Sequence, residues 1–154
     1  MKGIVTINTD AGWFRHQKVG SFAYWIKGDG IHLHGSGMLK GKIMSSTEAE
    51  TKAIANALYI LKESGVTGIK RIIINRDNIR AVNKKRGREE QKLVYQLLRH
   101  FWDKTNHETE FTKFYTFRHV KAHSNGTLAR DWVNNWCDAR CKERLKEWLK
   151  QNPY

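Results

Sequence analysis

Three strand-like segments at the start of the chain restrict its fold more than any other sequence feature. Residues 3–9 (GIVTINT) are rich in β-branched residues and alternate in polarity, and strand-like patterns follow at residues 20–27 (GSFAYWIK) and 31–39 (IHLHGSGML). The last two segments are separated by Gly28, Asp29 and Gly30, which are typical hairpin-turn residues. The three segments are therefore expected to form an antiparallel meander.

Helical and strand-like patterns alternate along the rest of the chain. Helix formers fill residues 47–63, with Gly65 as a stop signal, and helical patterns return at residues 91–104 and from Ala129 to Lys150. Strand-like patterns occupy residues 70–75 and 111–120. The order β-β-β-α-β-α-β-α predicts an α/β fold with one mixed sheet flanked by helices, in a single domain over residues 1–154.

The charge balance indicates a polyanionic partner. The chain carries 28 Lys and Arg against 15 Asp and Glu, a formal net charge of +13. Its apolar content of 40% is typical of an ordered globule. Nucleic acid is the commonest partner of such a protein, and a basic enzyme with an unrelated substrate is the alternative.

Cysteine use and hydropathy predict an intracellular protein. Cys137 and Cys141 lie four residues apart on the last predicted helix, and they are interpreted as reduced, packed thiols because two ligands do not make a structural zinc site. The N-terminus has no signal-peptide pattern, and no stretch approaches the ~20 apolar residues of a membrane span. We expect a cytoplasmic monomer without membrane contact.

Four carboxylates fall near the ends of predicted elements. Asp10 ends the first strand, Asp77 closely follows the apolar run of the fourth, Glu50 begins the first helix, and Asp138 lies early in the last helix. Both helical carboxylates are in line with the apolar stripe of their helix. A carboxylate that faces a core is unfavourable unless it is paired or binds a metal. The four residues therefore indicate a site of oxygen ligands for a hard cation. Metal ions held in such a site can catalyse the hydrolysis of phosphodiesters.

Ordinary structural roles are the alternative for each of these carboxylates. An Asp at a strand end is often a turn former, and Glu50 could complete a capping box with Thr47. Glu48 lies about 200° around the helix from Glu50, so it is expected to interact with the helix N-terminus instead.

The segments that contain these carboxylates resemble the motifs of type 1 ribonuclease H. TDA at residues 9–11 resembles the family's TDG, SSTEAETKAIANAL resembles its glutamate-bearing Ala-rich helix, and RIIINRDN resembles its apolar strand followed by S/T-Asp-Ser. HVKAH resembles V-K-G-H, and NNWCDARC resembles N-x-x-C-D-x-x-A. These motifs occur in the family's order across nearly the whole chain. The resemblance implies the family's five-stranded mixed sheet.

The same resemblance implies an endonuclease that hydrolyses the RNA strand of RNA/DNA hybrids with two Mg²⁺ ions, for which Mn²⁺ is an expected substitute. Asp10 would bridge the two ions, Asp138 would bind the ion that activates water, and Glu50 and Asp77 would hold the ion beside the leaving oxygen. His123 would assist proton transfer or product release. The implied substrate contacts are Ser45, Ser46, Thr47, Asn78, Lys84, Lys85, Arg86 and Asn134.

Departures from the family pattern leave the substrate and one ligand open. Ser46 and Thr47 stand where the family often has Asn residues, and the loop after Asp10 (GWFRHQKVG) lacks the family's Gly and Asn character. Branched or single-stranded DNA is therefore an alternative substrate, and a non-catalytic nucleic-acid-binding module is a third hypothesis. Asp131 is the alternative to Asp138 as the fourth carboxylate.

Aromatic and basic residues outside these motifs receive more ordinary interpretations. The loop from Trp13 to Lys18 is expected either to grip a nucleic-acid strand or to cover the edge of the core. Trp132, Trp136 and Trp148 are expected in the core. The expected solvent face of the last helix comprises Arg140, Lys142, Arg144, Lys146 and Lys150.

Overall fold

The secondary structure follows the predicted order, with one short helix added. The computed structural model describes residues 3–28, 30–76, 88–105, 109–119 and 129–153. Its strands are β1 (Ile4–Phe14), β2 (Val19–Gly28), β3 (Ile31–Met38), β4 (Arg71–Arg76) and β5 (Tyr115–His119). Its helices are α1 (Ser46–Glu63), α2 (Arg88–Asp103), α3 (Phe111–Phe114) and α4 (Ala129–Gln151).

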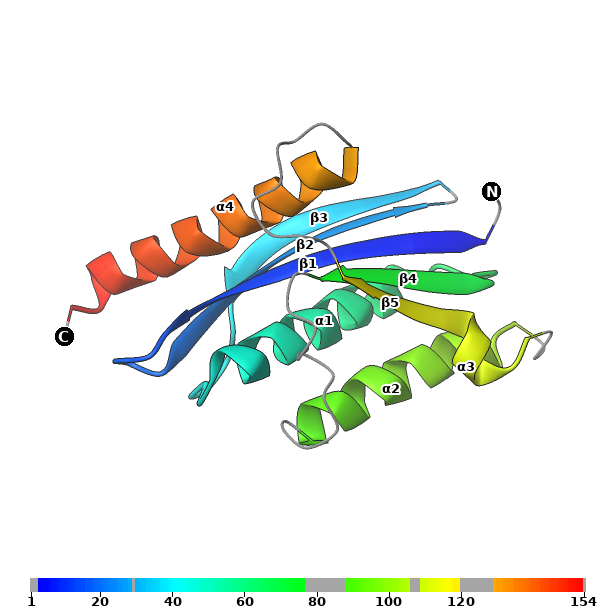
Figure 1. Cartoon of the computed structure of the whole chain (residues 1–154), viewed down its shortest axis with the longest axis horizontal. Coiled ribbons are helices and arrows are strands. Elements are labelled where there is room, and N and C mark those ends of the chain that lie inside the picture. Colours follow the sequence, from blue (N-terminus) through cyan, green and yellow to red (C-terminus); the bar gives the residue numbers. More distant parts are fainter. Residues whose placement is uncertain (1–2, 29, 77–87, 106–108, 120–128, 154) are drawn as a thin grey trace.

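The five strands form one mixed sheet in the order β3-β2-β1-β4-β5. The pairs β1–β2 and β2–β3 are antiparallel, which confirms the predicted meander. The pairs β1–β4 and β4–β5 are parallel. The long first strand thus joins the antiparallel and parallel halves at the centre of the sheet (Figure 1).

Helices cover both faces of the sheet. Helices α1 and α2 lie on one side of it, and α4 crosses the other side over β1, β2 and β3 (Figure 1). Successive side chains of a strand point to opposite faces. In β1, Val5 and Ile7 therefore join Leu58 of α1 in the main core, whereas Asn8 and Asp10 face α4. None of the helices in the described ranges combines the length and apolarity needed to cross a bilayer.

Strand β1 is longer than the sequence pattern predicts. It pairs with β2 residue by residue as far as Phe14, so Asp10 lies within the strand and not at its end. Trp13 consequently belongs to the strand, where it packs beside Leu39 and Ile43 and donates its indole N–H to the Ile43 carbonyl oxygen at 2.8 Å. The loop from Trp13 to Lys18 was expected either to grip nucleic acid or to cover the edge of the core. For Trp13, the structure supports the second alternative.

Two further expectations are corrected. Residues 111–114 form the short helix α3 and not the start of a strand, which places Phe114 in the core. Trp132 is 55% exposed and lies outside the core, although Trp136 packs beside buried Cys137. Helical periodicity alone did not distinguish these two tryptophans, because they lie four residues apart on nearly the same face of α4.

Candidate active site

Asp10 of β1 and Asp138 of α4 meet where the helix crosses the sheet. One carboxylate oxygen of each residue and the Cys141 sulfur lie within 4.8 Å of one another. Asp10 is buried, and Asp138 is half-buried. The structure thus brings together two carboxylates that lie far apart in the sequence.

Small residues beneath α4 permit this approach. Ser21 of β2 is fully buried and donates its hydroxyl to the Cys141 carbonyl oxygen at 2.6 Å. Its cross-strand neighbour is Gly12, where an added Cβ would lie 2.7 Å from the Ser21 hydroxyl oxygen. Larger side chains at these two positions would push α4 away from the sheet and separate Asp138 from Asp10.

Cys141 is the residue of this site that the sequence analysis did not assign to it. Burial, followed by the negative charges of Asp10, Asp138 and Glu50, raises the pKa of the Cys141 thiol. The thiol is therefore neutral near pH 7. All three carboxylates thus act on the Cys141 thiol. Cys141 stands where the resembling motif has Ala, and this difference is the sequence feature that could have identified it as part of the site.

Glu50 and Glu48 have separate roles at the start of α1. Ser45 caps the helix, its hydroxyl oxygen accepting the Glu48 backbone N–H at 3.0 Å, and Glu48 accepts the Met44 backbone N–H at 2.6 Å. The Glu48 side chain thus bonds the residue before the cap, one position earlier than in a capping box. The expected interaction of Glu48 with the helix N-terminus is confirmed. Because Ser45 is the cap, Thr47 lies inside the first turn of α1 and does not cap the helix. Glu50 is instead 8% exposed on the buried face.

A buried arginine interacts electrostatically with Glu50. Arg76, the last residue of β4, is 5% exposed, and its guanidinium lies 5.3 Å from the centroid of the Phe117 ring. Burial lowers the pKa of Arg76, while Coulomb interactions with Tyr95 and Glu50 oppose that shift. The cation therefore offsets part of the negative charge near the site. The resembling motif has Ser or Thr at this position, so the unusual Arg76 could have been noticed from the sequence.

A row of hydrogen-bonded polar side chains crosses the sheet beside Asp10. Asn75 of β4 donates to the Asn8 side-chain oxygen at 3.1 Å, and Arg118 of β5 donates its Nε–H to the Asn75 oxygen at 2.6 Å. Asn8 and Asn75 are buried, and Arg118 is exposed. Because Asn8 and Asp10 are two residues apart on one strand, the row and the carboxylate share a face of the sheet. The row thus orients a guanidinium on the face of the sheet that carries Asp10.

Asp138 also has a basic neighbour on its own helix. Lys142 donates to an Asp138 carboxylate oxygen at 2.9 Å. The hydrogen bond and the charge of Asp138 raise the pKa of Lys142. Lys142 therefore contacts the site from the exposed face of α4 that was expected to have only a general charge role.

Solved structures show which folds this arrangement of strands and helices is similar to. RNase H1 of the halophilic archaeon Halobacterium salinarum NRC-1 is 18% identical, with a TM-score of 0.64 over 94% of this chain and 99% of that one. LC11-RNase H1 in complex with an RNA/DNA hybrid is 16% identical, with a TM-score of 0.67 over 94% of this chain and 99% of that one. The chain has a ribonuclease H-like fold.

A third solved structure matches a similar share of the chain. The N-terminal RNase H domain of rv2228c from Mycobacterium tuberculosis, solved as a fusion with maltose-binding protein, is 12% identical, with a TM-score of 0.67 over 96% of this chain and 97% of that one. No protein-family model and no curated protein match the sequence. The ribonuclease H-like fold that the motifs predicted is therefore confirmed by shape and topology.

The predicted site residues fall into three groups in this fold. Asp10 and Asp138 present oxygens to one point, and the charge of Glu50 acts on the Cys141 thiol beside them. Buried Asp131, in the first turn of α4, is absent from the ligand group among the described residues. Ser45 caps α1, Ser46 is exposed, Thr47 is half-buried, and Asn134 is buried on α4. The residues outside the described ranges are Asp77, Asn78, Lys84, Lys85, Arg86 and His123.

The described side chains fit a hard divalent cation. Carboxylate oxygens are the ligands that Mg²⁺ and Mn²⁺ prefer, and Asp10 and Asp138 present them to one point from two elements. The charge of Glu50 also raises the pKa of the Cys141 thiol. Neutral Cys141 adds a soft donor that Mg²⁺ does not favour. Asp10 and Asp138, with Glu50 beside them, are thus the described residues that could hold such an ion.

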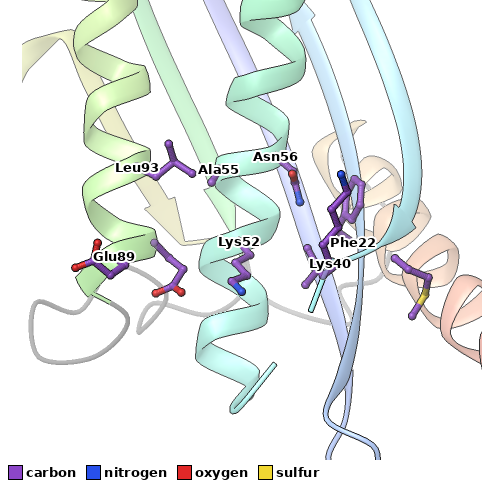
Figure 2. Close-up of a pocket in the computed structure, with 10 residues that line it drawn as sticks. Phe22, Lys40, Lys52, Ala55, Asn56, Glu89 and Leu93 are labelled. Atoms are coloured by element: carbon purple, nitrogen blue, oxygen red, sulfur yellow. The ribbon is translucent and has the colours of Figure 1, made fainter. Parts of the chain in front are cut away.

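A pocket elsewhere on the molecule is separate from these carboxylates. Its volume is about 510 Å³, and it is lined by side chains of β2, α1 and α2, of the end of β3 and of the segment after it (Figure 2). Phe22 and Leu93 contribute apolar surface, while Lys52 and Glu89 bring opposite charges to its rim. None of the candidate carboxylates lines it.

Proposed function

We propose that this chain is an endonuclease that hydrolyses the RNA strand of RNA/DNA hybrids with divalent cations, Mg²⁺ first among them. The observation that carries this proposal is the convergence of Asp10 and Asp138 within a ribonuclease H-like fold. The hybrid bound to LC11-RNase H1, which shares this fold, supports the choice of substrate. Residues 1–154 would act as one domain.

The proposed work of the chain is to bind and orient the reacting groups. Asp10, Glu50, Asp77 and Asp138 would hold two cations, with Asp10 shared between them. When bound, such cations activate water and stabilise the leaving oxygen. His123 would move a proton or help release the product.

Neighbouring side chains would keep these ligands in place. Lys142 restrains Asp138 through their hydrogen bond. Arg76 offsets part of the charge of Glu50, so that a cluster of carboxylates can be buried in the folded protein without a bound cation.

Arg118 is proposed to hold a phosphate of the substrate. Its Nε–H is engaged by Asn75, which is itself fixed by Asn8, so the guanidinium has a defined direction before the substrate arrives. A guanidinium oriented in this way binds phosphate with little loss of side-chain freedom. The contact would place the scissile strand over the face that carries Asp10.

The alternative substrate is supported by the start of α1. Ser46 and Thr47 replace the Asn residues that read a hybrid in the resembling family, and the Ser45 hydroxyl is engaged as the helix cap. These contacts favour a same-fold nuclease that cuts branched or single-stranded DNA as the second candidate. A non-catalytic binding module is less favoured, because buried carboxylates weaken the attraction of a polyanion.

Cleavage of four substrates under matched conditions tests the proposal. RNA/DNA hybrid, duplex RNA, duplex DNA and branched DNA would be incubated with Mg²⁺ and, in parallel, with excess chelator. We expect fastest cleavage of the hybrid and none in chelator. Faster cleavage of branched DNA would establish the second candidate, and no cleavage of any substrate would favour the binding module.

A further inference from the structure

One surface of the molecule, outside the main core, combines aromatic rings with guanidinium groups. On α4, Trp132, Trp136, Arg140 and Arg144 follow one another at intervals of four residues, so they form one stripe along the helix. Arg144 donates its Nε–H to the Ser36 hydroxyl oxygen of β3 at 2.9 Å, which shows that the stripe faces this strand. Strand β3 is an edge of the sheet.

Histidines and a tryptophan of the sheet complete the surface. Trp25 of β2 stacks on His34 of β3, with ring centroids 5.1 Å apart and an interplanar angle of 21°. Its ring also makes edge contacts with Trp132 and Trp136, at 5.4 and 5.1 Å. We call this set the β3–α4 surface: Trp25, His32, His34, Trp132, Trp136 and Arg140.

Part of this surface is not needed to complete the core. Trp25 and Trp136 are half-buried and pack on buried Ala23 and Cys137. Trp132 is 55% exposed, and both histidines are exposed. An indole left in water forgoes the stabilisation that its burial would bring, and exposed aromatic patches commonly mark binding sites.

The chemistry of the β3–α4 surface matches unpaired nucleobases. Flat rings stack on indole and imidazole faces without regard to base identity, and arginine adds cation–π and phosphate contacts. The Arg140 guanidinium lies 5.7 Å from the centroid of the Trp136 ring. Arg140 and Arg144 pair with Glu143 and Glu147, so the long-range attraction comes mainly from the net charge of +13 on the whole chain.

The surface also lies close to the candidate active site along α4. Trp132 precedes Asp138 by six residues, which corresponds to about 9 Å along the helix axis. A strand that reaches the carboxylates can therefore extend over Trp132 within a few nucleotides.

We propose that the β3–α4 surface is a stacking platform for the unpaired bases of single-stranded nucleic acid, including single strands that flank a duplex. This inference goes beyond the proposed nuclease, because binding there requires neither a cation nor cleavage. Trp132 supplies the main stacking face, and Arg140 contacts the backbone.

The affinity of the full chain for labelled oligothymidylate, measured by fluorescence anisotropy in excess chelator, tests this inference. Trp132→Ala is expected to weaken binding at least about fivefold. The matched control is Tyr59→Ala, which removes an exposed ring from α1 on the other side of the sheet and should leave the affinity unchanged. Chelator separates this result from any failure of metal-dependent cleavage.

Two conservative variants distinguish stacking from simple apolar contact and from a loss of folding. Trp132→Phe should retain most of the affinity, whereas Trp132→Leu should lose as much as Trp132→Ala. Wild-type affinity in the Ala or Leu variant would overturn the inference. So would an unchanged affinity accompanied by loss of a dimer in sedimentation, because the surface would then be an interface between two copies of the chain.

Discussion

The two glutamates at the start of α1 allow the sharpest test of the candidate site. Glu48 and Glu50 are two residues apart, but one belongs to the helix cap and the other to the buried face. We expect Glu50→Gln to lower the cleavage rate by several orders of magnitude, because a cation loses a charged ligand while the side chain keeps its shape. Glu48→Ala should leave the rate nearly unchanged.

The effect on stability should be reversed between the two positions. Glu48→Ala removes the acceptor of the Met44 N–H at 2.6 Å, whereas the hydrogen bond from the Glu48 N–H to Ser45 at 3.0 Å remains. Because the Met44 N–H can then bond to water, the loss should be about 0.5–1 kcal/mol. For a chain of this size, that lowers the melting temperature by about 1–4 °C. Glu50→Gln should melt close to the wild type.

Single-turnover cleavage of an RNA/DNA hybrid at saturating Mg²⁺ measures the rates, and calorimetry measures the melting temperatures. Any nucleic acid that the wild type cuts can replace the hybrid. An inactive Glu48→Ala beside an active Glu50→Gln would refute the reasoning, because the catalytic glutamate would then be the one at the helix cap. Equal loss of rate in both variants would show that the cap positions the site.

Three further predictions concern the other residues of the site. Asp10→Asn should abolish cleavage and weaken Mn²⁺ binding in calorimetric titration with the fold intact, and robust cleavage in excess chelator would contradict the metal-dependent mechanism. Arg118→Gln should weaken binding of the hybrid and reduce the slope of log affinity against log salt by about one, and an unchanged slope would exclude a phosphate contact. His123→Ala should slow turnover by about 10- to 1000-fold without changing Mn²⁺ affinity, and equal losses of rate and affinity would make His123 a ligand or a structural residue.

The placement of two candidate carboxylates on their helices could be predicted because its signals are local. Glu50 lies on the buried face of α1, as its position in the apolar stripe predicted, and Asp138 lies beside Cys141 as its helix pattern indicated. Lys142 and Arg144 are exposed on α4, as expected, but they also contact Asp138 and β3. Helical periodicity predicts which side of a helix is polar, but not which groups lie opposite that side.

By itself, the sequence determined the order of the elements and the meander at the start of the sheet. Those features depend on side-chain periodicity and turn residues within short segments. Only the tertiary structure decided that Cys141 joins Asp10, that Asn8 and Asn75 orient Arg118, and that Trp132 remains exposed while Trp136 packs on the sheet. Each of these outcomes depends on strand register or on how closely α4 approaches the sheet. Register and helix docking are set by contacts between residues far apart in the chain, and the pattern of any single segment does not contain them.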